Sequence, residues 1–362
     1  MKLSDVCTKG TSNIAQKDLN TRNGEYPIYG ASGFIKNVDF YHQENPYIAI
    51  VKDGAGVGRV MKLPAKSSVI GTMQYIIPNE SVSVEYLAYA LEHMNLSKYY
   101  LGAAIPHIYF KDYCNELLPN HTLEEQANIS HVLGLICDLI VLRKQQLSKL
   151  DELVKSRFIE LFGDPLLDDG RYPKVPLATL ADVGSSKRIF EKEYVSEGVP
   201  FYRTKEIVEL SKGNRITTEL FITRERHEEI RDEYGVPQKG DLLISAVGTI
   251  GVIWIVDGKN DFYFKDGNLL RVATSDNFAP TYIKHLLEAL IGAYKKEMSS
   301  GTAYAALTIS ALKEMPVYVV PITEQEQFAA FVEQTDKSKL AIQQSLDKLE
   351  TMKKALMQKY FG

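Results

Sequence analysis

The chain of 362 residues contains one internal repeat, and this repeat limits the folds that it can adopt. A hydrophobic residue and a proline lie shortly before residues 123–126 (Leu-Glu-Glu-Gln) in the first copy and residues 324–327 (Glu-Gln-Glu-Gln) in the second. Each segment leads into a long stretch with helical periodicity that ends in Phe-Gly, at Gly163 and at Gly362. Because such a repeat marks one structural unit used twice, we expect two homologous halves.

Both long stretches carry an apolar stripe that covers one side of a helix. The first stripe consists of Ile129, Leu133, Ile136, Ile140, Leu147, Leu150, Val154 and Leu161. The second consists of Phe328, Val332, Ile342, Leu346, Leu349, Leu356 and Tyr360. Thr122 and Thr323 are the expected N-caps, with Glu125 and Glu326 as their capping-box partners.

A helix of about forty residues spans roughly 60 Å, so each helix needs a partner along its apolar side. Pairing the two stripes as an antiparallel coiled coil buries both within one chain. The alternative is that the helices join copies of the chain in a homo-oligomer, but two stripes in one chain favour the internal pair. The predicted helix-pair interface consists of Leu133, Ile136, Ile140, Leu147, Leu150, Val154, Leu161, Val332, Ile342, Leu346, Leu349 and Leu356.

The globular parts that precede the helices also correspond to each other. Residues 49–58 resemble residues 242–251, since each is a β-rich run that enters a glycine turn and leads to another apolar run. This pattern predicts a hairpin-like element in each half. Residues 88–94 and 283–291 predict one short helix in each half. The chain length suits two cores of roughly 150 residues, so we expect two domains of an α+β fold.

No membrane span or leader is expected. The most apolar run, residues 133–142, contains Asp138 and is too short to cross a bilayer. The N-terminus lacks the apolar core of a signal peptide. Three widely spaced cysteines, Cys7, Cys114 and Cys137, are typical of a reducing compartment. We therefore expect a cytoplasmic protein with no membrane partner.

The sequence offers no constellation for catalysis or metal binding. The glycine turn at residues 53–58 leads into a strand-like run, whereas a dinucleotide site requires a helix there. Residues 45–47 (Asn-Pro-Tyr) lack the second proline of the adenine methyltransferase signature. The seven histidines show no metal-binding spacing, and the carboxylates of residues 225–233 alternate with cations as on a solvated helix face. We expect this chain to bind no metal and no cofactor.

Basic residues near turns and aromatic side chains are the candidate DNA contacts, because arginine recognises base edges and lysine contacts phosphates. The formal net charge of -4 argues mildly against nucleic-acid binding, but part of the acidity lies on the first long helix. DNA binding requires only a local basic face. The candidates are Lys9, Arg22, Lys52, Arg59, Lys62 and Lys66 in the first half, and Lys187, Arg188, Arg203, Lys205, Lys212 and Arg215 in the second.

The motifs and their order resemble the specificity subunits of type I restriction-modification systems over essentially the whole chain. In the second half the resemblance lies in residues 198–203 (Gly-Val-Pro-Phe-Tyr-Arg), 240–245 (Gly-Asp-Leu-Leu-Ile-Ser), 248–251 (Gly-Thr-Ile-Gly), Gly301-Thr302 and 321–327. In the first half it lies in residues 24–30, 54–58 and 123–126.

This resemblance implies two mixed α/β target-recognition domains, residues 1–121 and 163–321. Each is followed by a long spacer helix, residues 122–162 and 322–362, and the antiparallel helix pair gives the molecule pseudo-two-fold symmetry. Each domain of such a subunit reads one half of a bipartite, asymmetric target in double-stranded DNA, while the helices set the unread gap and dock two methyltransferase subunits. The chain itself is then not an enzyme, because the methyltransferase subunits bind S-adenosylmethionine and the restriction subunits cut DNA.

Two other functions stay open at this point. A stand-alone DNA-binding or structural protein would use the same helices for oligomerisation and bind no methyltransferase. A DNA methyltransferase or nuclease in its own right would show cofactor binding or turnover by the isolated chain.

Overall fold

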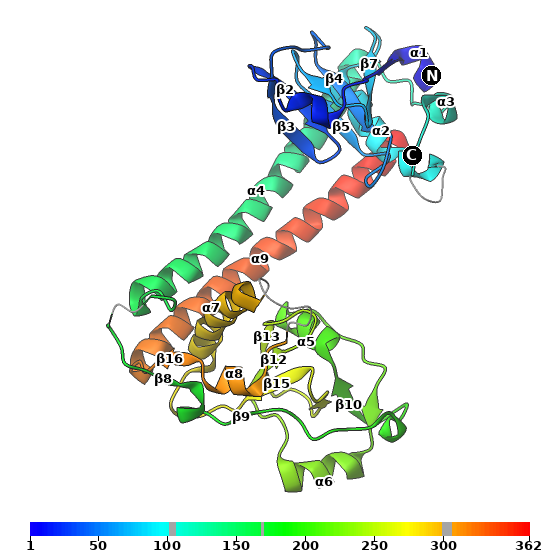
Figure 1. The fold of residues 1–362 in the computed structure, drawn as a ribbon. Helices are drawn as coiled ribbons and strands as arrows, with labels where there is room; N and C mark the ends of the chain where they lie inside the picture. Colours follow the sequence, from blue (N-terminus) through cyan, green and yellow to red (C-terminus); the bar gives the residue numbers. More distant parts are fainter. Residues whose placement is uncertain (101–105, 168–169, 299–305) are drawn as a thin grey trace. The chain divides into compact units, whose positions relative to one another are not determined.

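The computed structural model describes residues 1–100, 106–167, 170–298 and 306–362, which form two compact units. Unit 1 comprises residues 1–146 and 342–362, and unit 2 comprises residues 147–341. Two helices of 40 residues each, α4 (Leu123–Phe162) and α9 (Ile322–Phe361), contribute one part to each unit (Figure 1).

The described residues of unit 1 form two sheets and, besides parts of α4 and α9, three short α-helices. The larger sheet has the strand order β1-β7-β4-β5, with every neighbouring pair antiparallel. Its strands are β1 (Cys7–Thr11), β4 (Tyr47–Val51), β5 (Val60–Leu63) and β7 (Met73–Pro78). In the smaller sheet β2 (Tyr26–Gly30) is antiparallel to β3 (Gly33–Val38) and parallel to β6 (Ser68–Val69). The helices are α1 (Leu3–Val6), α2 (Val84–His93) and α3 (Phe110–Tyr113).

Unit 2 repeats this topology strand by strand. Its larger sheet has the order β9-β15-β12-β13, formed by β9 (Val183–Gly184), β12 (Leu242–Ser245), β13 (Ile253–Ile255) and β15 (Leu269–Val272). In its smaller sheet β10 (Val199–Tyr202) is antiparallel to β11 (Phe221–Ile222) and parallel to β14 (Tyr263–Phe264). A further pair joins β8 (Lys174–Pro176) to β16 (Pro316–Tyr318). The helices are α5 (Thr204–Ser211), α6 (Arg224–Tyr234), α7 (Pro280–Met298) and α8 (Ile309–Lys313).

The two units differ mainly in α5 and α6, which follow β10 and β11 and have no counterpart among the described elements of unit 1. These helices account for part of the greater length of the second globular half. The predicted hairpins are the antiparallel pairs β4–β5 and β12–β13, and the predicted short helices are α2 and α7. The predicted solvated helix at residues 225–233 lies within α6, of which only His227 and Ile230 are buried.

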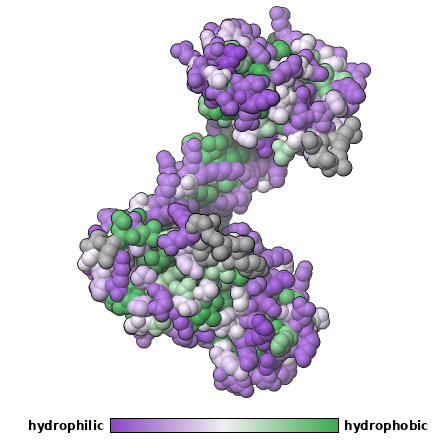
Figure 2. All heavy atoms as spheres, in the orientation of Figure 1, coloured by the Kyte–Doolittle hydropathy of each residue, from purple (hydrophilic) through white to green (hydrophobic). Residues whose placement is uncertain are grey.

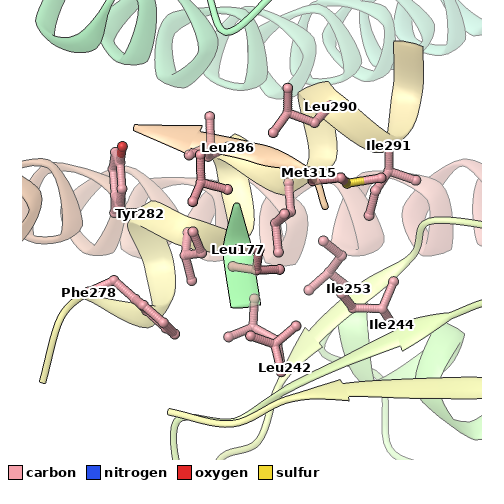
Figure 3. Packing of buried hydrophobic residues seen from close by; sticks show 14 of the residues in the cluster. Leu177, Leu242, Ile244, Ile253, Phe278, Tyr282, Leu286, Leu290, Ile291 and Met315 are labelled. Carbon is pink, nitrogen blue, oxygen red and sulfur yellow. The ribbon is translucent and has the colours of Figure 1, made fainter. Parts of the chain in front are cut away.

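One of the two central strands of each large sheet, β4 in unit 1 and β12 in unit 2, is buried along its whole length, as its continuous apolar sequence requires. Figure 3 shows Leu242 and Ile244 of β12 pointing toward Leu177 and Met315, with Leu286 and Ile291 of α7 completing the cluster. Each fully buried leucine or isoleucine stabilises such a core by about 1.5–3 kcal/mol. These clusters hold the sheets rigidly and so position the loops at their edges.

The long helices run antiparallel to each other within each unit. In unit 1 the start of α4, with Ile129 and Leu133, shares a hydrophobic cluster with Met357 near the end of α9. In unit 2 the end of α4, with Phe158, packs against Phe328 near the start of α9 at a ring-centroid distance of 5.4 Å.

Ion pairs flank this apolar seam in both units. Lys144 lies 3.0 Å from Glu350 in unit 1, and Lys339 lies 2.7 Å from Asp151 in unit 2. Burial is the largest single influence on Lys339 and disfavours its charged form, but the hydrogen bonds and charges of Asp151 and Asp336 together outweigh it and raise the pKa of the amine. Of the predicted interface residues, the buried ones are Leu133, Ile136, Val154, Val332 and Leu346, and the half-buried ones are Ile140, Leu147, Leu150, Leu161, Ile342, Leu349 and Leu356. The stripe as predicted omitted Phe158 and Met357, which are also buried.

A buried glutamine in the first turn of each long helix holds the start of a neighbouring helix. Gln126 accepts a hydrogen bond from the backbone nitrogen of Ser83, the N-cap of α2, and donates to two carbonyl oxygens. Gln325 accepts from the backbone nitrogen of Ala279, just before α7, and likewise donates to two carbonyl oxygens. Gln126 therefore corresponds to Gln325, and the sequence alignment that paired it with Gln327 was wrong by two residues.

The N-cap prediction is right for one long helix and wrong for the other. Thr122 and Glu125 form the reciprocal capping box expected before α4. Thr323 lies inside α9, which already begins at Ile322, so it is not a cap. Pro321 precedes this helix instead, and the hydroxyl of Tyr172 donates to the carboxylate of Glu324 in the first turn.

Helix α4 also carries a second apolar stripe that the seam with α9 leaves exposed. Val132, Leu135, Leu139 and Leu142 follow one another at spacings of three and four residues and are between 37% and 53% exposed. Because of these two stripes, α4 contains an 18-residue window that is apolar enough, by length and composition, to cross a membrane. Figure 2 shows hydrophobic surface on the helical part of the molecule.

Candidate nucleic-acid interface

One edge of the large sheet is built in the same way in both units. After β4 the chain turns through glycines, and the backbone nitrogen of Gly58 donates to the carbonyl of Val51 at 2.8 Å. After β12 the nitrogen of Gly251 donates to Ser245, also at 2.8 Å. Both glycines have φ near +85°, and a Cβ at Gly58 would lie 2.5 Å from the backbone nitrogen of Ser97, so only glycine is accommodated.

A segment from near the end of each globular part returns to the same edge. In unit 1 the nitrogen of Ile108 donates to the carbonyl of Lys52 at 3.0 Å. In unit 2 the nitrogen of Leu307 donates to Ala246 at 2.9 Å. We call this region, residues 52–59 with 106–109 in unit 1 and residues 246–251 with 306–307 in unit 2, the glycine-turn edge. Loops held by a rigid sheet in this manner are suited to binding.

Two of the six candidates in unit 1 lie at the glycine-turn edge. Lys52 is half-buried, with its amine 3.8 Å from the carboxylate of Asp53. Arg59 is exposed and donates from Nη1 to the carbonyl of Ala31 at 2.8 Å. Sequence reasoning missed three neighbours, His107, Tyr109 and Lys111, although their segment precedes the repeated helix in the same way as residues 306–307 do in unit 2.

The other four candidates in unit 1 do not gather into one cluster. Lys9 lies exposed within β1. Each of the remaining three is paired with a carboxylate: Arg22 with Asp39 at 3.1 Å, Lys62 with Glu85 at 3.2 Å, and Lys66 with Glu44 at 3.9 Å. These partners partly neutralise the cations, so the local basic face of unit 1 is smaller than the sequence indicated.

In unit 2 the candidates Lys187 and Arg188 follow β9, beside the start of β15. Ser185 donates to the carbonyl of Leu269 at 2.8 Å, which places this segment next to the strand end where the glycine turn begins. The amine of Lys187 lies over the ring of Tyr234 at 4.6 Å. The Arg188 guanidinium lies 2.8 Å from Asp266, and this hydrogen bond raises the pKa of the arginine.

A shallow pocket of about 280 Å³ opens beside Lys187. The hydroxyl oxygen of Ser186 is buried there and has no hydrogen-bond partner within the part of the chain that the structure describes. The pocket is lined by Ser185, Ser186, Lys187, Tyr234, Gly235, Tyr263, Phe264 and Arg271. Cations, a hydroxyl and aromatic rings are the groups that contact nucleic acids. Tyr234 and Arg271 were not among the predicted contacts.

The remaining candidates of unit 2 belong to α5 and the turn that follows it. Arg203 precedes the helix, and its guanidinium lies 3.1 Å from the buried carboxylate of Glu206. Lys212 ends the helix and hydrogen-bonds Glu209, which lowers the pKa of that carboxyl. Lys205 and Arg215 are exposed. The segment 203–205 thus begins a helix and is not the loop that the sequence suggested.

Residues 1–100, 106–167, 170–298 and 306–362 contain no group of three or more histidine, cysteine or carboxylate side chains that could hold a metal ion. The motif Gly301-Thr302 lies outside the described residues.

The profile of the type I restriction modification DNA specificity domain matches residues 1–152 and 172–351, one match for each half of the chain. The chain belongs to this family. A putative type I restriction enzyme specificity subunit of Haemophilus influenzae is 27% identical over 215 residues, which cover 57% of this chain and 53% of that protein. A putative type I specificity subunit of Mycoplasma pneumoniae is 24% identical over 344 residues, which cover 91% of this chain and 86% of that protein.

Solved structures of the family share the fold. The S subunit of a type I restriction-modification system from M. genitalium superposes with a TM-score of 0.63 at 16% identity, covering 100% of this chain and 95% of that one. A chain from a study of complex assembly and conformational transition of the type I system gives 0.59 at 17% identity, covering 100% and 96%. The mixed α/β fold with two long helices is therefore the fold of the type I specificity family, as predicted.

Proposed function

We propose that this chain is the DNA specificity subunit of a type I restriction-modification complex. Each unit contacts one half of a bipartite, asymmetric target, and the long helices set the gap between the halves. The observation that carries this proposal is the repeated glycine-turn edge, which has the same backbone in both units but different side chains. Two different readers suit a target with two different half-sites, whereas identical readers suit a palindrome.

The second apolar stripe of α4 supports a helical partner. Its spacing of three and four residues is that of a coiled-coil seam, whereas the exposed large apolar residues of α9 (Ile322, Leu340 and Met352) are isolated from one another. We assign this stripe to a helix of a methyltransferase subunit, because a specificity subunit has to hold the enzyme that it directs.

The catalytic steps then belong to other chains. Two methyltransferase subunits bind S-adenosylmethionine and transfer the methyl group, and restriction subunits cut DNA. This chain supplies the DNA contacts and the spacing, binds no cofactor itself, and acts in the cytoplasm.

The proposal is tested by the methylation pattern of cells that express this chain with its methyltransferase subunit. Single-molecule sequencing should show a split methylated motif that is absent from cells lacking this chain. Unchanged methylation despite confirmed expression of both proteins would contradict the proposal and favour a stand-alone DNA-binding or structural protein.

The stripe is tested separately by the double substitution Leu135→Glu and Leu142→Glu. We expect this variant to lose copurification of the methyltransferase subunit, because two charges would be buried in the seam. Leu340→Glu on α9 is the matched control, and it should bind the subunit as the unchanged chain does.

A further inference from the structure

The two units differ in chemistry at one equivalent pair of positions on the glycine-turn edge. In unit 1 Asp53 forms an isolated backbone bridge with His107, and in unit 2 Val247 forms the same bridge with Ala306. Asp53 is two residues after Val51, the last residue of β4, and Val247 is two residues after Ser245, the last residue of β12. Unit 1 therefore presents a polar pair where unit 2 presents an apolar one.

The imidazole of His107 is held in one orientation. Its Nδ1 hydrogen-bonds the carboxylate of Asp53, and its ring lies 4.1 Å from that of Tyr109. The amine of Lys111 lies over the ring of Tyr109, 5.1 Å from its centroid. The side chains of His107 and Asp53 are 26% and 29% exposed, so the pair is partly accessible from the surface.

The hydrogen bond to Asp53 determines which nitrogen carries the proton. An ionised carboxylate only accepts hydrogen bonds, so Nδ1 of His107 must be the donor. In the neutral ring Nε2 then carries the lone pair and is an acceptor. In the major groove the hydrogen-bond donors are the amino groups of adenine N6 and cytosine N4, while guanine and thymine present acceptors at the corresponding atoms.

We propose that Nε2 of His107 accepts a hydrogen bond from the exocyclic amino group of an adenine or cytosine, which makes His107 a specificity-determining residue of unit 1. This inference rests on the proposed function of the chain. Lys52 lies 3.8 Å from Asp53, Lys111 lies over the ring of Tyr109, and Arg59 follows the glycine turn that contains Asp53. These cations attract the phosphates that bring the base edge within reach. Val247 and Ala306 of unit 2 have no side-chain acceptor, so the half-site of that unit is recognised by other contacts.

The test is the methylated motif produced by His107→Ala and Asp53→Asn in the complex with the methyltransferase subunit. We expect His107→Ala to reduce discrimination at one base pair of one half-site by about tenfold, leaving the other half-site and the gap unchanged. Asp53→Asn should relax the same base pair by a smaller factor, because an amide permits either tautomer of the imidazole. This second substitution keeps the shape of the side chain and therefore serves even where the alanine variant fails to assemble.

His42→Ala is the matched control. His42 is an exposed histidine of the same unit that lies 3.4 Å from the hydroxyl of Tyr75, but it precedes β4 and so lies at the opposite end of that strand from Asp53. The substitution His42→Ala should leave the methylated motif unchanged. An unchanged motif in both His107→Ala and Asp53→Asn, or a uniform loss of methylation at all sites by a variant complex that has assembled, would overturn the inference. A failure of the proposed function is distinguishable, because the unchanged chain would then produce no split motif at all.

Discussion

The large sheets of the two units place very different side chains at the same two positions. In unit 1 Tyr47 and Tyr75 are buried with their ring centroids 5.2 Å apart. Ile48 and Ile76 are paired in unit 1 as Leu242 and Val272 are paired in unit 2. Tyr47 and Tyr75 directly precede the first pair, and Asp241 and Arg271 directly precede the second. The buried carboxylate of Asp241 lies 2.6 Å from Nε of Arg271 and also accepts from the backbone nitrogens of Gln238 and Thr274.

The fold therefore depends on strand order and on apolar central strands, not on the chemistry of individual interior pairs. An aromatic pair and a hydrogen-bonded ion pair both fit the same backbone. The two units have therefore diverged inside as well as at the glycine-turn edge. Such divergence is consistent with two readers of different half-sites on one scaffold.

The largest effect is expected from Asp241→Ala in unit 2. This substitution leaves Arg271 partly buried without its partner, and breaking such a pair costs about 3–5 kcal/mol. Hydrogen exchange should accelerate in β12 and β15 and stay unchanged in β4 and β7. Tyr47→Phe, which removes only the hydrogen bond from Ser67, should cost about 1 kcal/mol in unit 1. Equal losses of stability in Asp241→Ala and Tyr47→Phe would contradict the stated difference between the ion pair of unit 2 and the aromatic pair of unit 1.

Replacing either of the equivalent glutamines, Gln126 or Gln325, should cause the same loss of stability, of intermediate size. Gln126→Leu and Gln325→Leu should each cost about 2 kcal/mol, because each leaves a helix start without its hydrogen-bond partner. Exchange should accelerate in α2 for the first variant and in α7 for the second. Glu124→Leu, an exposed neighbour in the same turn, is the control and should change neither helix. Unequal effects would show that the glutamines are not equivalent.

The smallest effect distinguishes the starts of the two long helices. Thr122→Ala removes a capping box and should cost about 1 kcal/mol, whereas Thr323→Ala removes no cap and should stay within about 0.5 kcal/mol. Amide exchange in the first turns of α4 and α9 measures both.

This cap should also depend on pH. The backbone hydrogen bond from Thr122 lowers the pKa of Glu125. The contribution of the carboxylate is therefore present above the ordinary pKa of a glutamate and is lost as the pH falls through the lowered value. A first turn of α4 with no change in exchange through acid titration would contradict this role.

The long helices could be predicted because their period is local. Residues such as Leu133 and Val154 recur at helical spacing, so the stripe and its pairing are visible without any knowledge of contacts. The correspondence of Gln126 with Gln325 was missed because matching letters favours Gln327, whereas burial selects the glutamine in the first turn. Equivalent positions such as Tyr47 and Asp241 carry side chains of different chemistry, so no sequence similarity marks them as equivalent.

Which of the candidate cations lie together could not be predicted from the sequence, because their contacts join distant residues. Arg22 and Lys62 meet carboxylates 17 and 23 positions away, which no local pattern shows. His107 gains its orientation from Asp53, 54 residues earlier in the chain, so its role follows only from the fold. Residue type alone identifies the candidate cations, but the arrangement of the sheet determines which of them lie close together.

If two separate recognition units are joined by helices that set the gap, then lengthening both helices should lengthen the gap and leave both half-sites unchanged. Seven residues inserted after Gln146 in α4 and after Ala341 in α9 keep the apolar stripes in register, because seven residues complete one heptad. Each helix lengthens by about 10 Å, equivalent to at most about three base pairs of DNA. The methylated motif of this variant should keep both half-sites and show a longer gap; an unchanged gap, or altered half-sites, would contradict the account.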